Sequence, residues 1–506
     1  MVEPAASSSG ADSRSRPAPC RGSIVELRLL GVSDSDLRSR DRAVFWHPCG
    51  QMRDYDEFAP LEIVSAAGSR LRLADGREIL DAISSWWCKA LGHGHPALRE
   101  ALYAQAEAFE HVITANTTSA PLVRLCERLL AAANGAPAAA WGPDAPPGRA
   151  AGHFGKVFLA DNGSTAVEIA LKMALQAQAQ RGQPTRTRFV ALSNGYHGET
   201  VGALSVGDCE LYASPYRDLL FPVTKLAGLP YRSGPEDPRW MDAGAEWPAL
   251  ERALDAEAAT LAAIVYEPVL QAAGEMRVYS PELLRRLRRW ADAHGVYLVA
   301  DEIAAGMGRL GAILASHLAE GPGRVSREAL PDFATLSKGL TAGVLPLSAV
   351  LTTDAVAALF EGDWSEGRAF LHSNTYTGNA LAVAVANAVL DVFAREDILG
   401  RVATEGPGLR GALRDLVSRR PDLPLANVRG CGMMAAVDLR GAGGAALDPR
   451  RRTGYAVYRE AVRRGVLLRS IGDTMYLFPP LTVERADVGE MVAVLEASVA
   501  TVATTL

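Results

Sequence analysis

The run of residues best suited to holding an anion is Asp161-Asn162-Gly163-Ser164-Thr165. It follows an apolar segment and precedes a helical apolar pattern, so Gly163 and Ser164 are expected just before a helix N-terminus. Thr165 and Glu168 have the spacing of a capping box. Backbone N–H groups and the helix dipole at such a place favour a phosphate, although a plain capped turn is the alternative.

A carboxylate and an amine follow in two later motifs. Asp301 closes the apolar run 296–300, where a buried carboxylate is costly unless it has a partner; a helix cap or a surface acid is the alternative. In open α/β sheets, ligands bind outside the carboxyl ends of strands. Lys338 stands out because the chain has only five lysines among 52 basic residues. An amine can lose its proton and form an imine, whereas a guanidinium cannot, although a single lysine is more often a solvated surface residue.

The three motifs together predict a pyridoxal-phosphate site. This cofactor needs a lysine for its imine, an acid beside its pyridinium nitrogen and an anion-binding cup for its phosphate. Lys338, Asp301 and the pair Gly163 and Ser164 supply these groups. The prediction depends on their combination, because each motif alone has an ordinary structural explanation.

The elements that must position these residues alternate between strand and helix. Apolar segments at 156–160, 189–193, 261–267, 296–300 and 346–352 predict strands, and the patterns at 164–180 and 281–294 predict helices. This alternation is typical of βαβ units around a mostly parallel sheet. Earlier in the chain, short strands are predicted at 61–65, 70–74 and 78–83, followed by helices from Pro96 to about 110 and from near Pro121.

Changes in composition and pattern suggest four parts. Residues 1–41 are expected to form a flexible extension, 42–83 the first part of a small domain, 84–395 a large cofactor-binding domain, and 396–506 the rest of the small domain. Residues 132–153 are rich in Ala, Gly and Pro and predict a surface loop or insertion. After about residue 400 the pattern indicates an α+β arrangement. It predicts a helix at 401–419, short strands near 432–439, 466–469 and 474–478, and a last helix from about 484.

Composition excludes several classes of protein. The 506 residues carry a formal charge of −6, which is unlike a general nucleic-acid binder. No apolar run is long enough for a transmembrane helix. The six cysteines are scattered without a CxxC pair, so we expect neither a disulfide framework nor a zinc site, and a reducing, cytoplasmic location. The N-terminus lacks a secretory pattern, and its acidic residues argue against an organelle transit peptide.

Three other patterns have simpler explanations than a second site. Residues 306–311 fit GxGxxG, but a dinucleotide fingerprint should begin directly at the strand end, and residues 301–305 intervene. His93 and His95 lie in a Gly/Pro turn with no third ligand nearby, so we expect no metal. Trp86 and Trp87, taken alone, are more simply core aromatics, since neighbours on a strand point opposite ways.

From about Trp46 to Leu481 the chain resembles the class III, fold type I pyridoxal-phosphate aminotransferases. The matching stretches are Trp46-His47-Pro48, Ser84-Ser85-Trp86-Trp87, Gly94-His95-Pro96, Asp161-Asn162-Gly163-Ser164-Thr165, Asn194-Gly195-Tyr196-His197-Gly198, Glu267-Pro268, Ala300-Asp301-Glu302-Ile303, Ser337-Lys338-Gly339 and Val466-Leu467-Leu468-Arg469. The resemblance implies an α/β fold, with a large domain of mostly parallel sheet flanked by helices and a smaller α+β domain. The double tryptophan and Arg469 favour the branch of the family that acts in biotin biosynthesis.

The resemblance assigns cofactor-binding roles to the residues that stand at the matching positions of the family motifs. The resemblance implies that Lys338 is the imine lysine and proton shuttle, and that Asp301 pairs with the pyridinium nitrogen. It also implies that Gly163 and Ser164 hold the phosphate and that Tyr196 lies over the ring. Asn374 is expected beside the cofactor, and Thr375 is expected to reach the phosphate of the neighbouring subunit's cofactor, which implies a homodimer with shared sites.

Substrate roles carry over in the same way. The resemblance implies that Trp86, Trp87 and Tyr196 line the substrate cavity, with Ser373 nearby, and that Arg469 takes the carboxylate of the keto acid. Two positions depart from the family pattern: Cys49 replaces the commoner tyrosine, and Glu199 replaces the usual aspartate. Both bear on the pocket of the amino donor.

The activity implied is amino transfer to 7-keto-8-aminopelargonate, giving 7,8-diaminopelargonate by ping-pong chemistry, with S-adenosylmethionine as the donor. Lysine is the alternative donor. Another class III ω-aminotransferase, acting on ornithine or 4-aminobutyrate, is a rival that Trp86 and Trp87 disfavour. A non-catalytic regulator with this fold is a second rival, but residues 1–40 show no paired helices typical of DNA binding.

Overall fold

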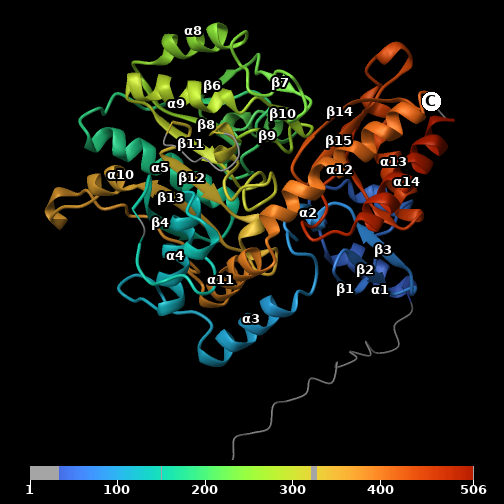
Figure 1. Cartoon of the computed structure of the whole chain (residues 1–506), viewed down its shortest axis with the longest axis horizontal. Coiled ribbons are helices and arrows are strands. Elements are labelled where there is room, and N and C mark those ends of the chain that lie inside the picture. Colours follow the sequence, from blue (N-terminus) through green and yellow to red (C-terminus); the bar gives the residue numbers. More distant parts are fainter. Residues whose placement is uncertain (1–33, 150, 321–327, 505–506) are drawn as a thin grey trace, which may run out of the picture. The chain divides into compact units, whose positions relative to one another are not determined.

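The computed structural model describes residues 34–149, 151–320 and 328–504, and it divides into two compact units, Met1–Leu61 and Glu62–Leu506 (Figure 1). In the first unit, helix α1 (Asp34–Val44) is followed by the short helix η1 (Met52–Asp56). Arg42 pairs with Asp56, and His47 Nε2 lies 2.7 Å from Asp41 Oδ2. Helix α1 overlaps the segment expected to be a flexible extension; residues 1–33 lie outside the described residues.

A seven-stranded sheet forms the centre of the second unit. Its strand order is β4-β13-β12-β11-β8-β5-β6. The strands are β4 (Phe154–Ala160), β13 (Ser348–Thr353), β12 (Phe333–Leu336), β11 (Tyr297–Asp301), β8 (Leu261–Tyr266), β5 (Arg188–Leu192) and β6 (Val223–Leu226). Only β13 runs antiparallel to its neighbours, so six strands share one direction. The prediction of a mostly parallel sheet is therefore confirmed.

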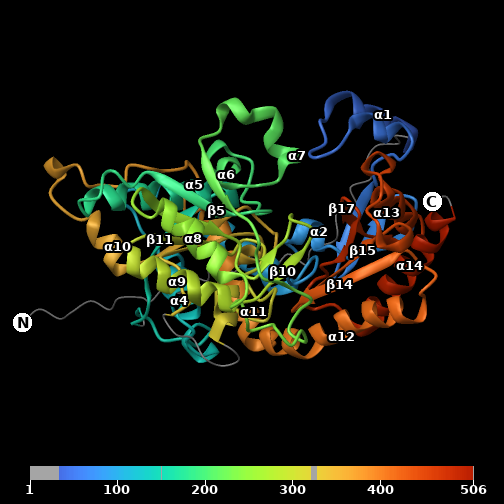
Figure 2. The same ribbon diagram turned by 90° about the horizontal axis from the view of Figure 1, so that it is seen from above.

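Helices cover both faces of this sheet. Figure 2 shows α5 (Gly163–Gln180) and α6 (Val201–Val206) on one side, and α4 (Ala120–Ala133), α9 (Glu282–His294) and α11 (Ala380–Arg395) on the other. The strands alternate accordingly: Val350 packs in the α5 layer, whereas Ala349 and Leu351 pack in the opposite layer with α4 and α11. Burial on both faces explains why these strands read as continuous apolar runs in the sequence.

Two four-stranded sheets complete the smaller part of this unit. One has the order β1 (Ile63–Ala67), β2 (Arg70–Leu73), β3 (Glu78–Asp81), β16 (Val466–Leu467). The other has the order β14 (Leu425–Cys431), β15 (Met434–Leu439), β18 (Thr474–Leu477), β17 (Arg469–Ile471). Strand β16 runs parallel to β3, so residues near both ends of this unit share one sheet. Helices α12 (Ile398–Arg419) and α13 (Thr453–Arg463) pack against these strands, and α14 (Arg485–Ala503) packs on α12 and α13.

The remaining elements are short or lie at the edges. The helices are α2 (Ser84–Trp87), α3 (Pro96–Ala108), α7 (Glu210–Ala213), α8 (Trp247–Glu257) and α10 (Asp354–Leu359). A small three-stranded sheet has the order β7 (Tyr231–Arg232), β10 (Arg277–Tyr279), β9 (Leu270–Gln271). The predicted helices from Pro96 and near Pro121 are confirmed as α3 and α4. The predicted surface loop at 132–153 is only partly correct, because Trp141 is buried in the core.

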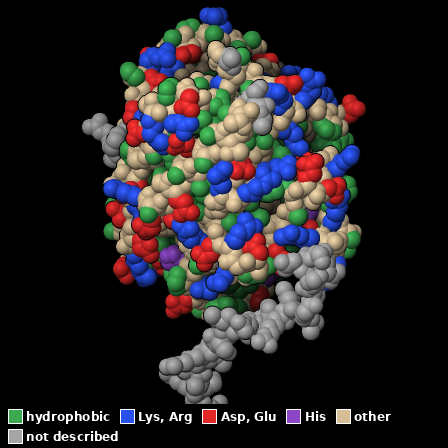
Figure 3. All heavy atoms as spheres, turned by 90° about the vertical axis from the view of Figure 1, so that its right-hand side faces the viewer, with side chains coloured by type: hydrophobic (Ala, Val, Ile, Leu, Met, Phe, Trp, Pro, Cys, Tyr) green, Lys and Arg blue, Asp and Glu red, His purple; other side chains and the backbone are tan. Residues whose placement is uncertain are grey.

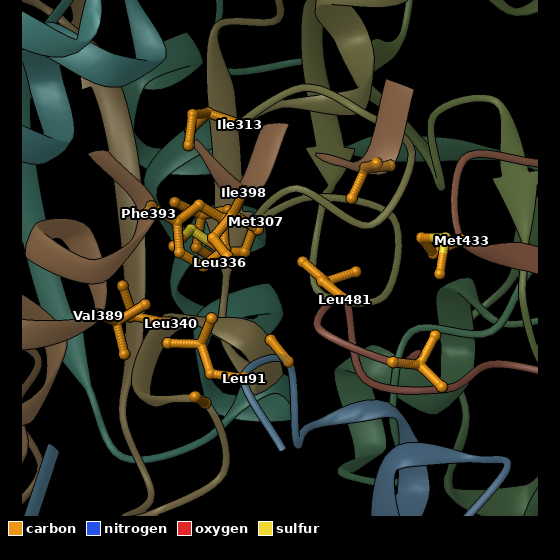
Figure 4. Packing of buried hydrophobic residues seen from close by; sticks show 14 of the residues in the cluster. Leu91, Met307, Ile313, Leu336, Leu340, Val389, Phe393, Ile398, Met433 and Leu481 are labelled. Carbon is orange, nitrogen blue, oxygen red and sulfur yellow. The ribbon is translucent and has the colours of Figure 1, made fainter. Parts of the chain in front are cut away.

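The GxGxxG pattern at 306–311 belongs to the packed interior. Met307 lies among Leu336, Phe393 and Ile398 (Figure 4). A Cβ atom on Gly308 would stand 2.7 Å from the Phe393 ring. These glycines therefore permit close packing of a loop against helix α11, as the offset from the strand end suggested.

The surface carries mixed charge. On the face shown in Figure 3, basic and acidic side chains are interspersed. Elsewhere in the described chain charged side chains pair, as Arg420 does with Asp422 and Glu496. Among the helices of the described chain, none is long and apolar enough to cross a membrane.

Candidate active site

Polar residues gather where the six parallel strands end. Asn162 follows β4, Tyr196 and His197 follow β5, Glu267 follows β8, and Lys338 follows β12. Because parallel strands end at one edge of a sheet, these side chains meet there. They border a cavity of about 180 Å³, lined by Trp87, Asn162, Gly163, Ser164, Tyr196, His197, Gly198, Glu267, Asp301, Ile303, Ala304, Ser337 and Lys338.

Asp301 is fixed at the floor of this cavity. Its side chain is buried, and Oδ2 lies 2.8 Å from Nδ1 of His197. Oδ1 accepts from the Ile303 amide at 3.1 Å and from the Thr335 hydroxyl at 3.3 Å. The other ring nitrogen of His197 is buried without a hydrogen-bond partner among the described residues. A carboxylate held this firmly is well suited to pair with a cationic ring nitrogen.

Lys338 faces the same cavity. Its Nζ lies 5.3 Å from the centre of the Trp87 ring. Burial lowers the pKa of Lys338, and the negative charges of Asp301 and Glu267 oppose this shift. A lowered pKa raises the fraction of neutral amine, which is the form that acts as a nucleophile or base. The structure therefore brings Lys338 and Asp301, both predicted from the sequence as site residues, to the lining of one cavity.

Glu267 is a site residue to which sequence reasoning assigned no role. It accepts hydrogen bonds from the Tyr196 amide at 2.9 Å and the Ala272 amide at 3.0 Å. Burial, reinforced by the charge of Asp301, raises the pKa of Glu267 to about 8. The rule that singled out Asp301, an acid at the end of an apolar strand, applies equally to Glu267 and could have found it.

Helix α5 presents its first turn to the cavity. The cap is Asn162, whose Oδ1 accepts from the Thr165 amide at 3.1 Å. The predicted Thr165–Glu168 capping box is wrong: Glu168 instead accepts from the Gly202 and Ala203 amides at the start of α6. Gly163 and Ser164 were expected just before the helix and are its first residues. The amides of a first turn have no partner within the helix, so this end still suits an anion.

Tyr196 and Glu199 form a pair beside the cofactor site. The Tyr196 hydroxyl donates to Glu199 Oε1 at 2.9 Å, and the Glu199 amide donates to Ser164 Oγ at 3.3 Å. The Glu199 carboxylate is exposed, so it adds negative charge beside the Tyr196 ring. The position where the family pattern has aspartate is therefore connected both to the tyrosine and to the helix terminus.

Trp86 and Trp87 lie on the turn α2, not on a strand. Four successive residues from Ser84 to Trp87 have positive φ, between 50° and 90°. Left-handed backbone costs about 1–2 kcal/mol for each residue other than glycine, so this turn is strained. Trp87 is buried against Tyr476 and Phe478 and borders the cavity, whereas the Trp86 ring lies 4.8 Å from the Arg469 guanidinium carbon. Arg469 forms no ion pair with any described residue of the chain.

Seven predicted residues are not in the lining of this cavity: Trp86, Glu199 and Arg469, described above, and Cys49, Ser373, Asn374 and Thr375. Thr375 is exposed, and its carbonyl oxygen accepts from His111 Nε2 at 2.8 Å. Ser373 is also exposed, whereas the Asn374 side chain has a buried Oδ1 without a hydrogen-bond partner in the described chain. Cys49 is exposed in the first unit, with a φ of 50°.

Two other places do not resemble a catalytic site. A larger cavity of about 680 Å³ lies at the amino ends of the strands, bordered by His153, Arg181, Tyr297 and Asp332, and it has no lysine in its lining. His93 bonds to Asp81, and His95 lies 3.5 Å from Glu396. No group of three or more metal-ligating side chains occurs in the described ranges.

The comparisons with known proteins agree with this geometry. The family model "Aminotransferase class-III" matches residues 51–499. The chain belongs to the class III aminotransferases. A relative from Geobacter sulfurreducens, named adenosylmethionine-8-amino-7-oxononanoate aminotransferase, is 37% identical over 92% of this chain and 98% of its own length. The Helicobacter pylori protein of that name is 35% identical over 90% and 96%.

Solved structures show the same fold. The adenosylmethionine-8-amino-7-oxononanoate aminotransferase of Methanocaldococcus jannaschii matches with a TM-score of 0.80 and 29% identity, over 93% of this chain and 99% of that one. A PLP-bound amine transaminase from an uncultivated Pseudomonas species matches with a TM-score of 0.78 and 34% identity, over 90% and 98%. This class III aminotransferase is thus a fold type I enzyme that uses pyridoxal phosphate. The residues fit that cofactor, because an amine, a buried carboxylate and a free helix terminus border one cavity.

Proposed function

We propose that this aminotransferase moves an amino group from S-adenosylmethionine to 8-amino-7-oxononanoate (7-keto-8-aminopelargonate), giving 7,8-diaminopelargonate for biotin biosynthesis. The observation that carries the proposal is the pair formed by Trp86 and Arg469 beside Trp87 and Lys338, in a chain whose near-full-length relatives bear the corresponding name. An aromatic face attracts a sulfonium cation, and the Arg469 guanidinium, which has no carboxylate partner among the residues that the structure describes, suits the keto acid.

Each residue of the site has a proposed task in this reaction. Lys338 would form the covalent link to the cofactor and Asp301 would hold a proton at its ring nitrogen, while Gly163 and Ser164 bind its phosphate. When bound, pyridoxal phosphate supplies the electron sink that stabilises negative charge at the reacting carbon. Lys338 Nζ would remove the Cα proton of the donor and deliver it to the cofactor, and the lowered pKa of Lys338 favours its action as a base.

The surrounding residues orient the two substrates. His197 and Thr335 keep the Asp301 carboxylate in place through their hydrogen bonds. The Tyr196 ring borders the cavity, and Glu199 adds negative charge near the cationic donor. Since one cavity serves the donor and then the acceptor, we expect ping-pong kinetics.

We further propose a homodimer in which Thr375 reaches the partner's cofactor phosphate. The support is that Thr375 is exposed and lies in an apolar surface region that includes Ile113, Leu371 and Tyr376, which are 64%, 75% and 59% exposed. His111 joins the segments of this region through its bond to Thr375 and its ring contact with Tyr376. Exposed apolar side chains gathered on one surface are typical of a protein interface.

Cytoplasmic location is proposed as well, since Cys88, Cys126, Cys209 and Cys431 are free thiols.

The test follows the absorbance of the bound cofactor after adding one donor at a time, without keto acid. We expect rapid conversion by S-adenosylmethionine, followed by recovery when 8-amino-7-oxononanoate is added. Conversion by lysine and none by S-adenosylmethionine would show that lysine is the donor and would leave the proposed acceptor unchanged. Conversion only by ornithine, 4-aminobutyrate or related amines would reject the proposal.

A further inference from the structure

The turn Ser84–Trp87 carries both tryptophans of the site in a backbone conformation that its residues do not favour. The φ values are 50°, 51°, 90° and 71° in chain order, and none of these residues is glycine. Strained backbone persists only where surrounding contacts impose it, and it tends to occur at functional sites. The contacts that impose this turn therefore decide where the two indole rings stand.

One buried carboxylate makes several of those contacts, beside the bond from the Ser84 hydroxyl to the Phe478 carbonyl oxygen at 2.7 Å. Asp81, at the end of β3, is 0% exposed. Its Oδ1 accepts from the amides of Ile83 and Ser85, both at 3.1 Å. Its Oδ2 accepts from the Ser85 hydroxyl at 3.0 Å and lies 2.9 Å from His93 Nε2. The four partner groups lie in the residue just before the turn, in the turn itself and in the loop that follows it.

This cluster does not have the connections of a hydrolytic triad. In a triad the acid and the nucleophile bind opposite nitrogens of the histidine. Here both Asp81 Oδ2 and Ser85 Oγ approach the same atom, His93 Nε2, at 2.9 and 3.4 Å. The His93 backbone is itself tied to Gly68 by two hydrogen bonds. The cluster therefore anchors the turn to β3 and to the β1–β2 connection.

We propose that Asp81 is the positioning residue of the aromatic wall formed by Trp86 and Trp87. By holding the left-handed turn, its carboxylate sets the Trp87 indole 5.3 Å from Lys338 Nζ and the Trp86 indole 4.8 Å from the Arg469 guanidinium. Asp81 is not in the lining of the cavity, so it acts on substrates only through the two tryptophans. The substrates named here rest on the proposed function; the positioning itself does not.

The experiment uses the holoenzyme labelled with 5-fluorotryptophan. The chain has eight tryptophans, and Trp86→Phe and Trp87→Phe assign the two resonances of interest. Asp81→Ala removes every acceptor, whereas Asp81→Asn keeps one oxygen for the two amides. Asp332→Ala is the matched control, because Asp332 also accepts a backbone N–H, from Leu298 at 2.8 Å, and pairs with Arg288, but at the amino ends of the strands.

We expect Asp81→Ala to shift the Trp86 and Trp87 resonances and to raise KM for both substrates about tenfold, with the cofactor affinity unchanged within about threefold. Asp81→Asn should shift them less, and Asp332→Ala should leave them in place. Unshifted resonances with KM unchanged would overturn the proposal, as would equal shifts in the Asp332→Ala control. If Asp81→Ala does not fold, Asp81→Asn is compared with Asp332→Ala instead. Unshifted Trp86 and Trp87 resonances in Asp81→Asn would then overturn the proposal.

The fluorine readout needs no substrate. Shifted resonances in an enzyme that ignores both proposed substrates would reject the proposed function and keep the role of Asp81. In that case KM is measured with whichever donor converts the cofactor. Unshifted resonances in an enzyme that uses both substrates would keep the proposed function and reject the role of Asp81.

Discussion

At the scale of single residues, the site is a balance of charge in a small buried space. Two carboxyl groups, Asp301 and Glu267, face one amine, Lys338. Burial penalises the charged forms of Glu267 and Lys338. The raised pKa of Glu267, about 8, and the lowered pKa of Lys338 are consequences of this crowding.

Replacing Lys338 by alanine should lower amino transfer by at least about a thousandfold, because the variant lacks the proposed proton shuttle. The circular dichroism spectrum should stay that of the parent. Borohydride reduction of the parent enzyme, followed by peptide mapping, should locate the cofactor on Lys338. Cofactor found on Lys89 or Lys225 would contradict the assignment.

Glu267 gives a prediction about pH. Its ordinary pKa is 4.5, and in the folded chain it is about 8, so between these values the folded chain holds a proton that the unfolded chain has lost. Its contribution to stability is therefore complete below about pH 4.5 and declines as the pH rises to about 8, by up to about 1.4 kcal/mol per pH unit. Glu267→Gln resembles the protonated form and should remove this decline.

The measurement is the thermal unfolding midpoint of the cofactor-free enzyme between pH 5 and pH 8, compared for parent and Glu267→Gln. The difference between the two curves isolates Glu267 from other titrating groups, such as Glu302. The expected difference grows in favour of the variant as the pH rises. A constant offset would show that Glu267 is ionised throughout.

At the scale of elements, the start of helix α5 depends on the loop that follows β5. Gly198 has a φ of 122°, and a Cβ atom there would stand 2.0 Å from Ser164 Oγ. Gly198→Ala should therefore displace the first turn of α5 and weaken pyridoxal phosphate binding by about tenfold or more. Titration of the apoenzyme with the cofactor measures this.

Gly182→Ala is the control for this prediction. Gly182 also has a positive φ, of 84°, but no atom lies within 4 Å of a Cβ built there. Both variants carry the backbone cost of a left-handed alanine, but only Gly198→Ala crowds the helix terminus. Equal losses of cofactor affinity in the two variants would count against a phosphate site at α5.

The helices and strands show which parts of the fold could be predicted from the sequence. Long apolar strands such as β4, β8 and β11 and the helices α5 and α9 were predicted because their patterns are strong. Strand β12 was missed because it has only four residues, Phe333–Leu336, directly before the lysine motif. The cap of α5 was misplaced because Asn162 and Thr165 are both good capping residues, and only the backbone decides between them.

Tertiary contacts were beyond such patterns. The strand position assumed for Trp86 and Trp87 was wrong because Asp81 bends the chain there, and no local signal shows that a carboxylate will be buried against the turn. Likewise, the exposed helix α1 has no apolar stripe, so periodicity could not find it. Resemblance supplied the residue roles that periodicity could not.

At the scale of the whole molecule, the proposed sharing of sites between subunits can be tested by complementation. Mixing inactive Lys338→Ala with inactive Thr375→Glu gives mixed dimers in which one site carries both changes and the other carries neither. Equal mixing with random exchange should restore about a quarter of the parent activity. No recovery, with exchange verified by mass, would contradict the shared site.

The single antiparallel strand β13 has a consequence for how the enzyme is made. It lies between β4, which leads into the first turn of α5, and β12, which ends two residues before Lys338. These two halves of the site become neighbours only when residues 348–353 take their place in the sheet. These residues are synthesised almost two hundred residues later than β4. The growing chain therefore cannot assemble the cofactor site until most of it has been synthesised, and the cofactor must be taken up by a nearly finished protein.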